Sequence, residues 1–204
     1  FQIGLISKFL SYGIFYVVFI RETVKDPYIN IFNMFKQQTQ QLQIMAERDP
    51  LTNLYNHNFT FSKIDNLIEK YKDSEELIFV AMIDLDNFKD VNDSFGHQKG
   101  DEVLIKFSKT LLKSSYDERI VGRYGGDEFI VAGLFESKER CIEKFSIFSD
   151  RIERAFEDMK VDVKYSAGIA VCHEGDSTKD LIYKADIKMY ESKRQGKNRV
   201  NFWE

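Results

Sequence analysis

The chain has 204 residues, of which 43% are hydrophobic, so it can bury the core of one ordinary domain with some residues left over. Its net charge of −4 argues against nonspecific nucleic-acid binding as the main activity. Two cysteines and three histidines are scattered along the sequence, which argues against a disulfide framework and against a histidine-built zinc site.

The N-terminal segment is nearly apolar and is followed by positive charge. Residues 3–20 are apolar apart from Lys8 and several serines and glycines, and Arg21 and Lys25 follow. About 20 apolar residues span a bilayer, and basic residues mark its cytoplasmic side. We therefore expect residues 1–25 to be the end of a transmembrane helix. A buried or interfacial amphipathic helix is the alternative.

Residues 26–47 are predicted to form a signalling or linker helix after the break at Asp26-Pro27. Its apolar residues follow a roughly heptad-spaced stripe: Ile31, Phe35, Leu42 and Met45. Two interpretations stay open. The helix is either a plain amphipathic connector or one helix of a parallel two-stranded coiled coil that pairs two copies of the chain.

Residues 48–204 are predicted to form the globular domain, which begins with a turn-rich segment. The patterns indicate, in order, a helix to about residue 72, a strand at 77–85, a helical turn and loop at 87–96, a helix at 98–114, paired strands at 119–122 and 129–134, a helix at 137–159, a strand at 163–172, a helix at 178–194 and a strand at 199–203. This order predicts an α/β (α+β) fold, with about five mostly antiparallel strands flanked by helices.

Acidic residues end the first of these strands. The strand is apolar on both faces, which is typical of a central buried strand, but it ends in Asp84 and Asp86. Acids at such a position are costly unless a metal, a hydrogen bond or solvent compensates them. The alternative is that the strand simply ends in solvent.

Two glycines and two acids join the paired strands. Gly125 and Gly126 predict a tight hairpin, because only glycine takes positive φ at both central turn positions without strain. Asp127 and Glu128 follow directly. Such a turn can let a polyphosphate approach the backbone while the acids hold a divalent metal. The alternative is a solvated hairpin tip.

The sequence Gly-Gly-Asp-Glu-Phe at residues 125–129 is the signature of GGDEF-domain diguanylate cyclases. Other segments resemble that family in the same order: residues 49–52, 84–93, 96–101, 166–168, Ala185-Asp186 with Met189, Tyr190 and Lys193, and residues 196–198. Several motifs in order are more specific than any one of them. The chain thus resembles the C-terminal catalytic domain of a membrane-anchored bacterial sensor protein.

The resemblance implies a nucleotide-cyclase, ferredoxin-like palm that condenses two GTP into cyclic di-GMP and two pyrophosphates. It implies a homodimer, with Mg²⁺ as the cofactor and Mn²⁺ as a substitute, and a catalytic domain in the cytoplasm at the bacterial inner membrane. A catalytically silent GTP-binding regulatory domain is the alternative, and a mononucleotide cyclase is a second one.

The resemblance also assigns roles to residues. Metal would be held by Asp84, by the backbone carbonyl of Leu85 and by Asp127. Either Asp127 or Glu128 would take the proton of the attacking hydroxyl, and the sequence does not choose between them. The substrate-binding residues would be Phe88 and Lys89 through their backbone, Lys193 and Lys197 at the phosphates, Gly125 and Gly126 at the turn, Asn92 and Asp101 at the guanine edge, and His97 as a neighbour of the nucleotide.

Plainer interpretations of some of these residues stay open. Lys193 and Lys197 are spaced to favour the dipole at a helix end. Asn92 suits a turn, Asp101 suits the first turn of a helix, and His97 suits a cap or loop.

The chain also departs from the family pattern. Asn53 stands where glycine is usual, His57 where arginine is usual, and Lys197 where arginine is common. Residues 116–119 lack both end residues of the Arg-x-x-Asp product-inhibition site, so we expect weak or no product inhibition through that site.

Overall fold

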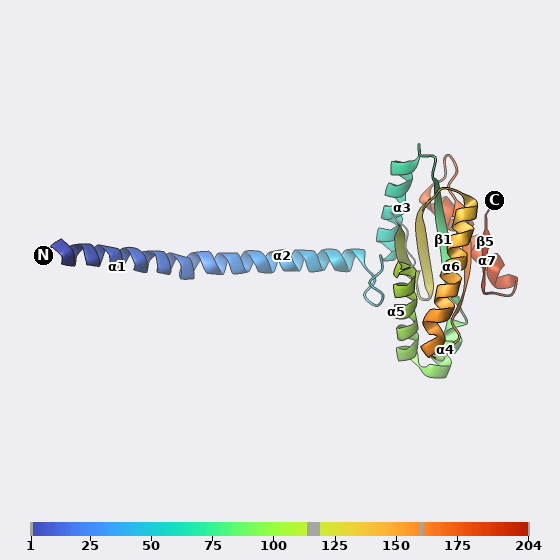
Figure 1. The fold of residues 1–204 in the computed structure, drawn as a ribbon, viewed down its shortest axis with the longest axis horizontal. Helices are drawn as coiled ribbons and strands as arrows, with labels where there is room; N and C mark the ends of the chain where they lie inside the picture. Colours follow the sequence, from blue (N-terminus) through green and yellow to red (C-terminus); the bar gives the residue numbers. More distant parts are fainter. Residues whose placement is uncertain (1, 114–118, 160, 204) are drawn as a thin grey trace. The chain divides into compact units, whose positions relative to one another are not determined.

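The computed structural model describes residues 2–113, 119–159 and 161–203. The chain divides into two compact units, Phe1–Met45 and Ala46–Glu204. Figure 1 follows the chain from its N-terminus to its C-terminus by colour.

The first unit is helical throughout its described residues. Helix α1 (Gln2–Ile20) leads through a π-helical turn (Arg21–Lys25) into α2 (Asp26–Glu47). The expected break therefore appears as a π-turn, and Pro27 lies in the first turn of α2, where its missing N–H needs no partner. The predicted stripe on α2 is exposed in the single chain, at 51, 61, 67 and 74% for Ile31, Phe35, Leu42 and Met45.

The expectation of a transmembrane helix end at residues 1–25 finds no support. Among the described residues, no helix combines the length and the apolar character needed to cross a bilayer.

The second unit follows the predicted order of helices and strands. Its elements are α3 (His57–Tyr71), β1 (Leu77–Asp86), α4 (Phe88–Phe95), α5 (His97–Lys113), β2 (Ile120–Gly125), β3 (Glu128–Phe135), α6 (Lys138–Phe156), a 3-10 turn (Glu157–Met159), β4 (Lys164–Val171), α7 (Thr178–Arg194) and β5 (Arg199–Phe202). One segment is more regular than predicted, because the expected helical turn and loop after β1 is the eight-residue helix α4.

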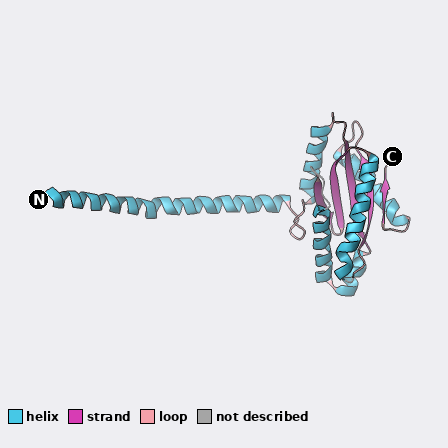
Figure 2. Cartoon of the chain, in the orientation of Figure 1, coloured by secondary structure: helices cyan, strands magenta, loops and turns pink. Residues whose placement is uncertain are grey.

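The five strands form one sheet in the order β2-β3-β1-β4-β5. All neighbouring pairs are antiparallel except β4 and β5, which are parallel. The predicted five-stranded, mostly antiparallel sheet flanked by helices is confirmed, and Figure 2 shows the strands in magenta between the helices. Strand β1 is central, so both of its edges are paired.

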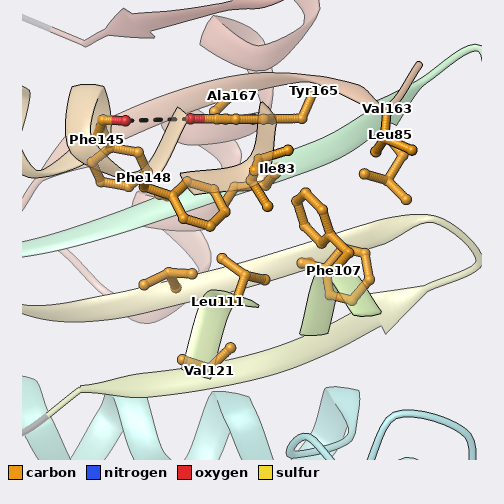
Figure 3. Packing of buried hydrophobic residues seen from close by; sticks show 14 of the residues in the cluster. Ile83, Leu85, Phe107, Leu111, Val121, Phe145, Phe148, Val163, Tyr165 and Ala167 are labelled. Carbon is orange, nitrogen blue, oxygen red and sulfur yellow. Dashed lines mark hydrogen bonds between the residues drawn. The ribbon is translucent and has the colours of Figure 1, made fainter. Parts of the chain in front are cut away.

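The two faces of the sheet are buried against different helices. Phe79, Ala81, Ile83 and Leu85 of β1 pack into a cluster with buried residues of α5 and α6. Figure 3 labels Ile83 and Leu85 in this cluster, together with Phe107 and Leu111 of α5 and Phe145 and Phe148 of α6. The alternate residues of β1 pack with α3 and α7. Because side chains alternate along a strand, Asp84 and Asp86 lie on the α7 face at the end of β1.

Candidate active site

The acids of β1 and of the hairpin lie side by side. Asp84 is directly opposite Glu128 in the β1–β3 register, and the N–H of Leu85 donates to the carbonyl oxygen of Asp127 at 3.3 Å. The side chain of Leu85 is buried in the core, which leaves its backbone as the part available to the site. The register thus brings together the strand end and the turn that the sequence singled out separately.

Negative charge is concentrated at this edge. Burial raises the pKa of the Asp84 carboxyl, and the neighbouring Asp127 and Asp86 raise it further, although an ion pair with Lys193 acts in the opposite direction. The Lys193 Nζ lies 2.7 Å from Asp84 Oδ2. Burial also raises the pKa of Glu128, and the charge of Asp84 is the next cause. These acids would be stabilised by a further positive charge.

The donor set suits a hard cation with few protein ligands. No group of three or more His, Cys, Asp and Glu side chains suitable for a metal lies within the described part of the chain. Mg²⁺ commonly binds through one or two carboxylates and keeps waters or substrate phosphates as its other ligands. Asp84 and Asp127, with the carbonyl of Leu85, fit that pattern, and their metal role stays a prediction.

The hairpin turn is tight, but its geometry differs from the expectation. Only Gly126 has positive φ, at 52°, whereas Gly125 pairs with Glu128 at the end of β2. A Cβ at either glycine would contact no described heavy atom within 4 Å. The glycines therefore relieve no internal clash, and their missing side chains leave the surface open beside the acids.

Arg123 holds this turn in place, a role that the sequence did not reveal. Its Nε and one terminal nitrogen donate to the carbonyl oxygen of Gly126 at 3.0 and 2.7 Å. The other nitrogen donates to the carboxylate of Asp49 at 3.1 and 3.2 Å. Burial alone would raise the pKa of the Asp49 carboxyl. Hydrogen bonds from Thr52 and Arg123 outweigh burial, so the pKa lies below its ordinary value. The only signal in the sequence is a cation close before the two glycines.

The two predicted phosphate lysines approach the same edge from the C-terminal side. Lys193 lies in the last turn of α7, as the dipole interpretation required, but its ammonium is paired with Asp84. Lys197 follows the helix, and its Nζ donates to Asn87 Oδ1 at 2.5 Å. Asn87 is the N-cap of α4 and makes no side-chain capping bond. The Lys197 ammonium therefore lies at the N-cap residue of α4, directly before Phe88 and Lys89 in the chain.

Close packing of α7 on the sheet brings these lysines to the acids. A Cβ at Gly168 of β4 would lie 2.0 Å from the carbonyl oxygen of Ala185 and 2.1 Å from the amide nitrogen of Met189. Only glycine fits this contact, so the axis of α7 lies unusually near β4. Gly168, in the Ser166-Ala167-Gly168 segment that resembles the family, therefore has a packing role.

The predicted guanine residues lie on α4 and α5 rather than on the sheet edge. Asn92 is half-buried on α4, whereas His97 and Asp101 are exposed in the first turns of α5. Gly100 was given no role from the sequence. A Cβ at Gly100 would lie 2.0 Å from Asn92 Oδ1, so Gly100 leaves room for the Asn92 side chain between the two helices.

Asn53, His57 and Lys197, the three single-residue departures from the family pattern, all lie in the described part of the chain. Asn53 has φ 58°, a left-handed conformation that explains why glycine is usual there. The ring of His57 contacts the rings of Phe61 and Tyr124, with centroids 4.6 and 4.7 Å apart.

Residues 116–118 of the product-inhibition segment lie outside the described residues. Arg119, the last position of the segment, donates to the carbonyl oxygens of Leu111, at 2.6 Å, and of Leu112. Its guanidinium is therefore engaged with the end of α5.

Comparison with known proteins finds a matching family model and several relatives. The family model described as "Diguanylate cyclase, GGDEF domain" matches residues 46–199. A diguanylate cyclase of Vibrio cholerae is 32% identical over 168 residues, which cover 78% of this chain and 50% of that protein. Diguanylate cyclase DosC of Escherichia coli is 30% identical over 188 residues, covering 90% of this chain and 40% of DosC. The chain therefore spans half or less of the length of these relatives.

Solved structures share the fold. The coiled coil and GGDEF domain of DgcB from Caulobacter crescentus, in complex with c-di-GMP, matches with a TM-score of 0.74 at 25% identity, covering 91% of this chain and 100% of that one. The active GGEEF domain of a Vibrio cholerae diguanylate cyclase matches with a TM-score of 0.64 at 28% identity, covering 73% of this chain and 97% of that one.

Proposed function

Because the chain belongs to the GGDEF family of diguanylate cyclases, we propose that it condenses two GTP into cyclic di-GMP and two pyrophosphates, as a homodimer with Mg²⁺. The observation that supports this most directly is the cross-strand placement of Asp84 and Glu128, with Lys193 2.7 Å from Asp84. A silent relative would have no need to keep mutually repelling acids side by side, with Asp84 buried, because such a cluster costs stability.

In this reaction the 3′-hydroxyl of each GTP attacks the α-phosphate of the other, and pyrophosphate leaves in line. Catalysis of this kind depends mainly on positioning and on neutralising charge. Lys193, Lys197 and the first amides of α4 at Phe88 and Lys89 would bind the β- and γ-phosphates. The open surface at the hairpin glycines would let the triphosphate lie against the backbone.

Proton removal falls to Asp127 or Glu128. Burial and the neighbouring Asp84 raise the pKa of Glu128, which makes its carboxylate a better proton acceptor near neutral pH. Asp127 lies in the turn, where the amide of Leu85 donates to its carbonyl oxygen. Both residues stay candidates, and a bound Mg²⁺ would lower the pKa of the attacking hydroxyl and stabilise the phosphate oxygens.

Guanine would be recognised between α4 and α5. The Asn92 amide and the Asp101 carboxylate can hydrogen-bond the guanine edge, and a carboxylate accepts from the ring N–H and the exocyclic amine, which adenine cannot match. Each domain holds one GTP, so two copies are needed for one turnover. The exposed apolar stripe of α2 would support that pairing.

The test is incubation of the full chain with GTP and Mg²⁺, followed by chromatography of the products across a range of enzyme concentrations. We expect cyclic di-GMP, a rate per molecule that rises with concentration, and at least a 1000-fold loss in the Asp127→Asn variant, because metal ligands and bases contribute about that much. Bound GTP without product would instead indicate a regulatory module. Cyclic GMP as the product would indicate a mononucleotide cyclase.

A further inference from the structure

Asp86 is a buried acid to which the proposed reaction gives no role. It is the last residue of β1, its exposed fraction is 8%, and it lies on the α7 face of the sheet two positions after Asp84. A carboxylate is rarely this buried unless its oxygens are paired. The contacts of Asp86 therefore indicate what it does.

The carboxylate joins three separate segments of the chain. Ser166 Oγ of β4 donates to Asp86 Oδ1 at 2.7 Å, and the backbone N–H of Asn198 donates to Oδ2 at 2.8 Å. The first bond fixes the carboxylate against the neighbouring strand. The second bond reaches the loop that follows α7, so Asp86 links that loop to the centre of the sheet.

The loop needs such a link because its backbone is strained. Lys197 has φ 63° and Asn198 has φ 46°, so two consecutive residues other than glycine are left-handed. This conformation is unfavourable for residues other than glycine and persists only where the surroundings hold it. The N–H of Lys197 donates to the carbonyl of Ser192 at 3.0 Å. The loop is thus held by the end of α7 on one side and by Asp86 on the other.

The same loop sets the position of the Lys197 ammonium. Lys197 Nζ reaches Asn87 Oδ1 at 2.5 Å, and Asn87 is the residue directly after Asp86. Asn87 is itself left-handed, with φ 58°, and it begins α4. Asp86 is therefore close to both ends of the lysine. It holds the backbone beside Lys197 through the N–H of Asn198, and it directly precedes Asn87, which accepts from the ammonium.

We propose that Asp86 is a positioning residue, which holds residues 196–198 so that Lys197 faces the β- and γ-phosphates of GTP. This inference rests on the proposed function, because that function assigns the phosphates to Lys197. It predicts that the triphosphate, and not the guanosine part of the ligand, depends on Asp86.

The test compares two ligands on the full chain by calorimetric titration with Mg²⁺. One ligand is α,β-methylene GTP, which cannot lose pyrophosphate, and the other is GMP, which lacks the β- and γ-phosphates. In Asp86→Ala we expect affinity for the triphosphate analogue to fall roughly tenfold, because one charge-assisted phosphate contact is lost. Affinity for GMP should change less than about twofold.

Asp86→Asn is the conservative rescue. Its amide oxygen can accept from the Asn198 N–H while its amide nitrogen donates to Ser166 Oγ, so we expect affinity for the triphosphate within about threefold of wild type. Ser166→Ala removes only one of the two bonds and is a second variant in case Asp86→Ala does not fold. We expect Ser166→Ala to lower the affinity for the triphosphate analogue about threefold and to leave the affinity for GMP unchanged.

Asp176→Ala is the matched control. Asp176 is also a partly buried carboxylate that accepts from a backbone N–H, that of His173, and from a side chain, Lys184. Its loss should lower the melting temperature without changing the ratio of the two affinities. In the Lys197→Ala background, Asp86→Ala should have no further effect on the triphosphate analogue, because the positioned group is already absent.

The proposal would be overturned if Asp86→Ala lost the same factor of affinity for both ligands, or lost affinity for neither. It would also be overturned if Asp86→Asn failed to restore binding of the triphosphate analogue. A wild-type chain that binds the triphosphate analogue but makes no cyclic di-GMP would refute the proposed reaction while leaving the Asp86 test valid. A wild-type chain that binds neither ligand would refute both.

Discussion

Two short backbone segments border the candidate site, and they are held in place in different ways. The left-handed residue of the hairpin turn is a glycine, Gly126, and the guanidinium of Arg123 donates hydrogen bonds to its carbonyl oxygen. The left-handed residues of the loop after α7 are Lys197 and Asn198, and the carboxylate of Asp86 accepts a hydrogen bond from the backbone N–H of Asn198. In both segments a charged side chain on the sheet fixes a backbone group at the rim.

The difference shows what each segment contributes. The turn leaves open surface beside the acids, so glycine is the suitable residue and its cost is low. The loop must present a lysine side chain, so it cannot use glycine there and depends on an outside hydrogen bond instead. Removing the hydrogen bonds of Arg123 or of Asp86 should therefore have different consequences in the two segments.

Replacing Arg123 with alanine should have the largest effect among these variants. The turn would lose both bonds to Gly126 and the link to Asp49, so we expect turnover to fall 10- to 100-fold and the free energy of unfolding to fall by about 1–3 kcal/mol. Turnover assays and denaturant unfolding measure the two losses. The exposed Arg140–Glu143 pair offers a control, since Arg140→Ala should cost less than about 1 kcal/mol. Full turnover in Arg123→Ala would remove its role at the turn.

Gly100→Ala should have the next largest effect, on recognition of the base. The new Cβ would lie 2.0 Å from Asn92 Oδ1, so the amide must move away from the guanine edge. We expect KM for GTP to rise about tenfold with a smaller change in kcat, because one base contact is worth about 1–3 kcal/mol. Steady-state kinetics with GTP would show it, with Lys109→Ala on the exposed face of α5 as the control. An unchanged KM would place guanine elsewhere.

The buried acids predict a stability effect with a definite sign. Burial and the charge of Asp84 raise the pKa of Glu128 above 4.5, so the folded chain binds this proton more tightly than the unfolded chain does. Stability therefore falls as the pH rises through the raised pKa. Glu128→Gln should melt a few degrees above wild type at pH 7–8, and the difference should vanish as the pH falls towards 4.5.

Asp180 provides a control of opposite sign for that experiment. Hydrogen bonds from the side chain and backbone of Ser177 lower the pKa of Asp180, so its charge stabilises the fold at neutral pH. Asp180→Asn should therefore melt below wild type at pH 7–8, and the gap should close as the pH falls below 3.8. If both variants shifted in the same direction, their charges would not explain the shifts.

Substitutions of Asn53 should have the smallest effect. This residue has a left-handed backbone and no assigned role in the site. Because its φ is 58°, Asn53→Gly should change the free energy of unfolding by less than about 1 kcal/mol, whereas Asn53→Ala should lower it by about 1–2 kcal/mol. Thermal unfolding of the two variants measures the difference, and turnover should match wild type in Asn53→Gly. A stabilising effect of alanine would mean that the left-handed backbone is not strained there.

The sequence by itself determined most of the second unit. Apolar periodicity located its helices and strands, the two-sided apolar pattern identified β1 as central, and the ordered motifs indicated the family. These features depend on neighbouring residues in the chain, so they can be inferred without coordinates. For the first unit, composition suggested a membrane span, and no described helix is long and apolar enough to cross a bilayer.

Only the tertiary structure decided how the motifs are joined. The register places Asp84 opposite Glu128, and contacts across 74, 80 and 112 positions of sequence link Arg123 to Asp49, Ser166 to Asp86 and Asn198 to Asp86. Left-handed backbone at Lys197 and close packing at Gly100 likewise depend on segments that meet only in the folded chain. A hydrogen bond between distant segments leaves no periodic pattern in the sequence, and for that reason it appears only once the sheet has brought them together.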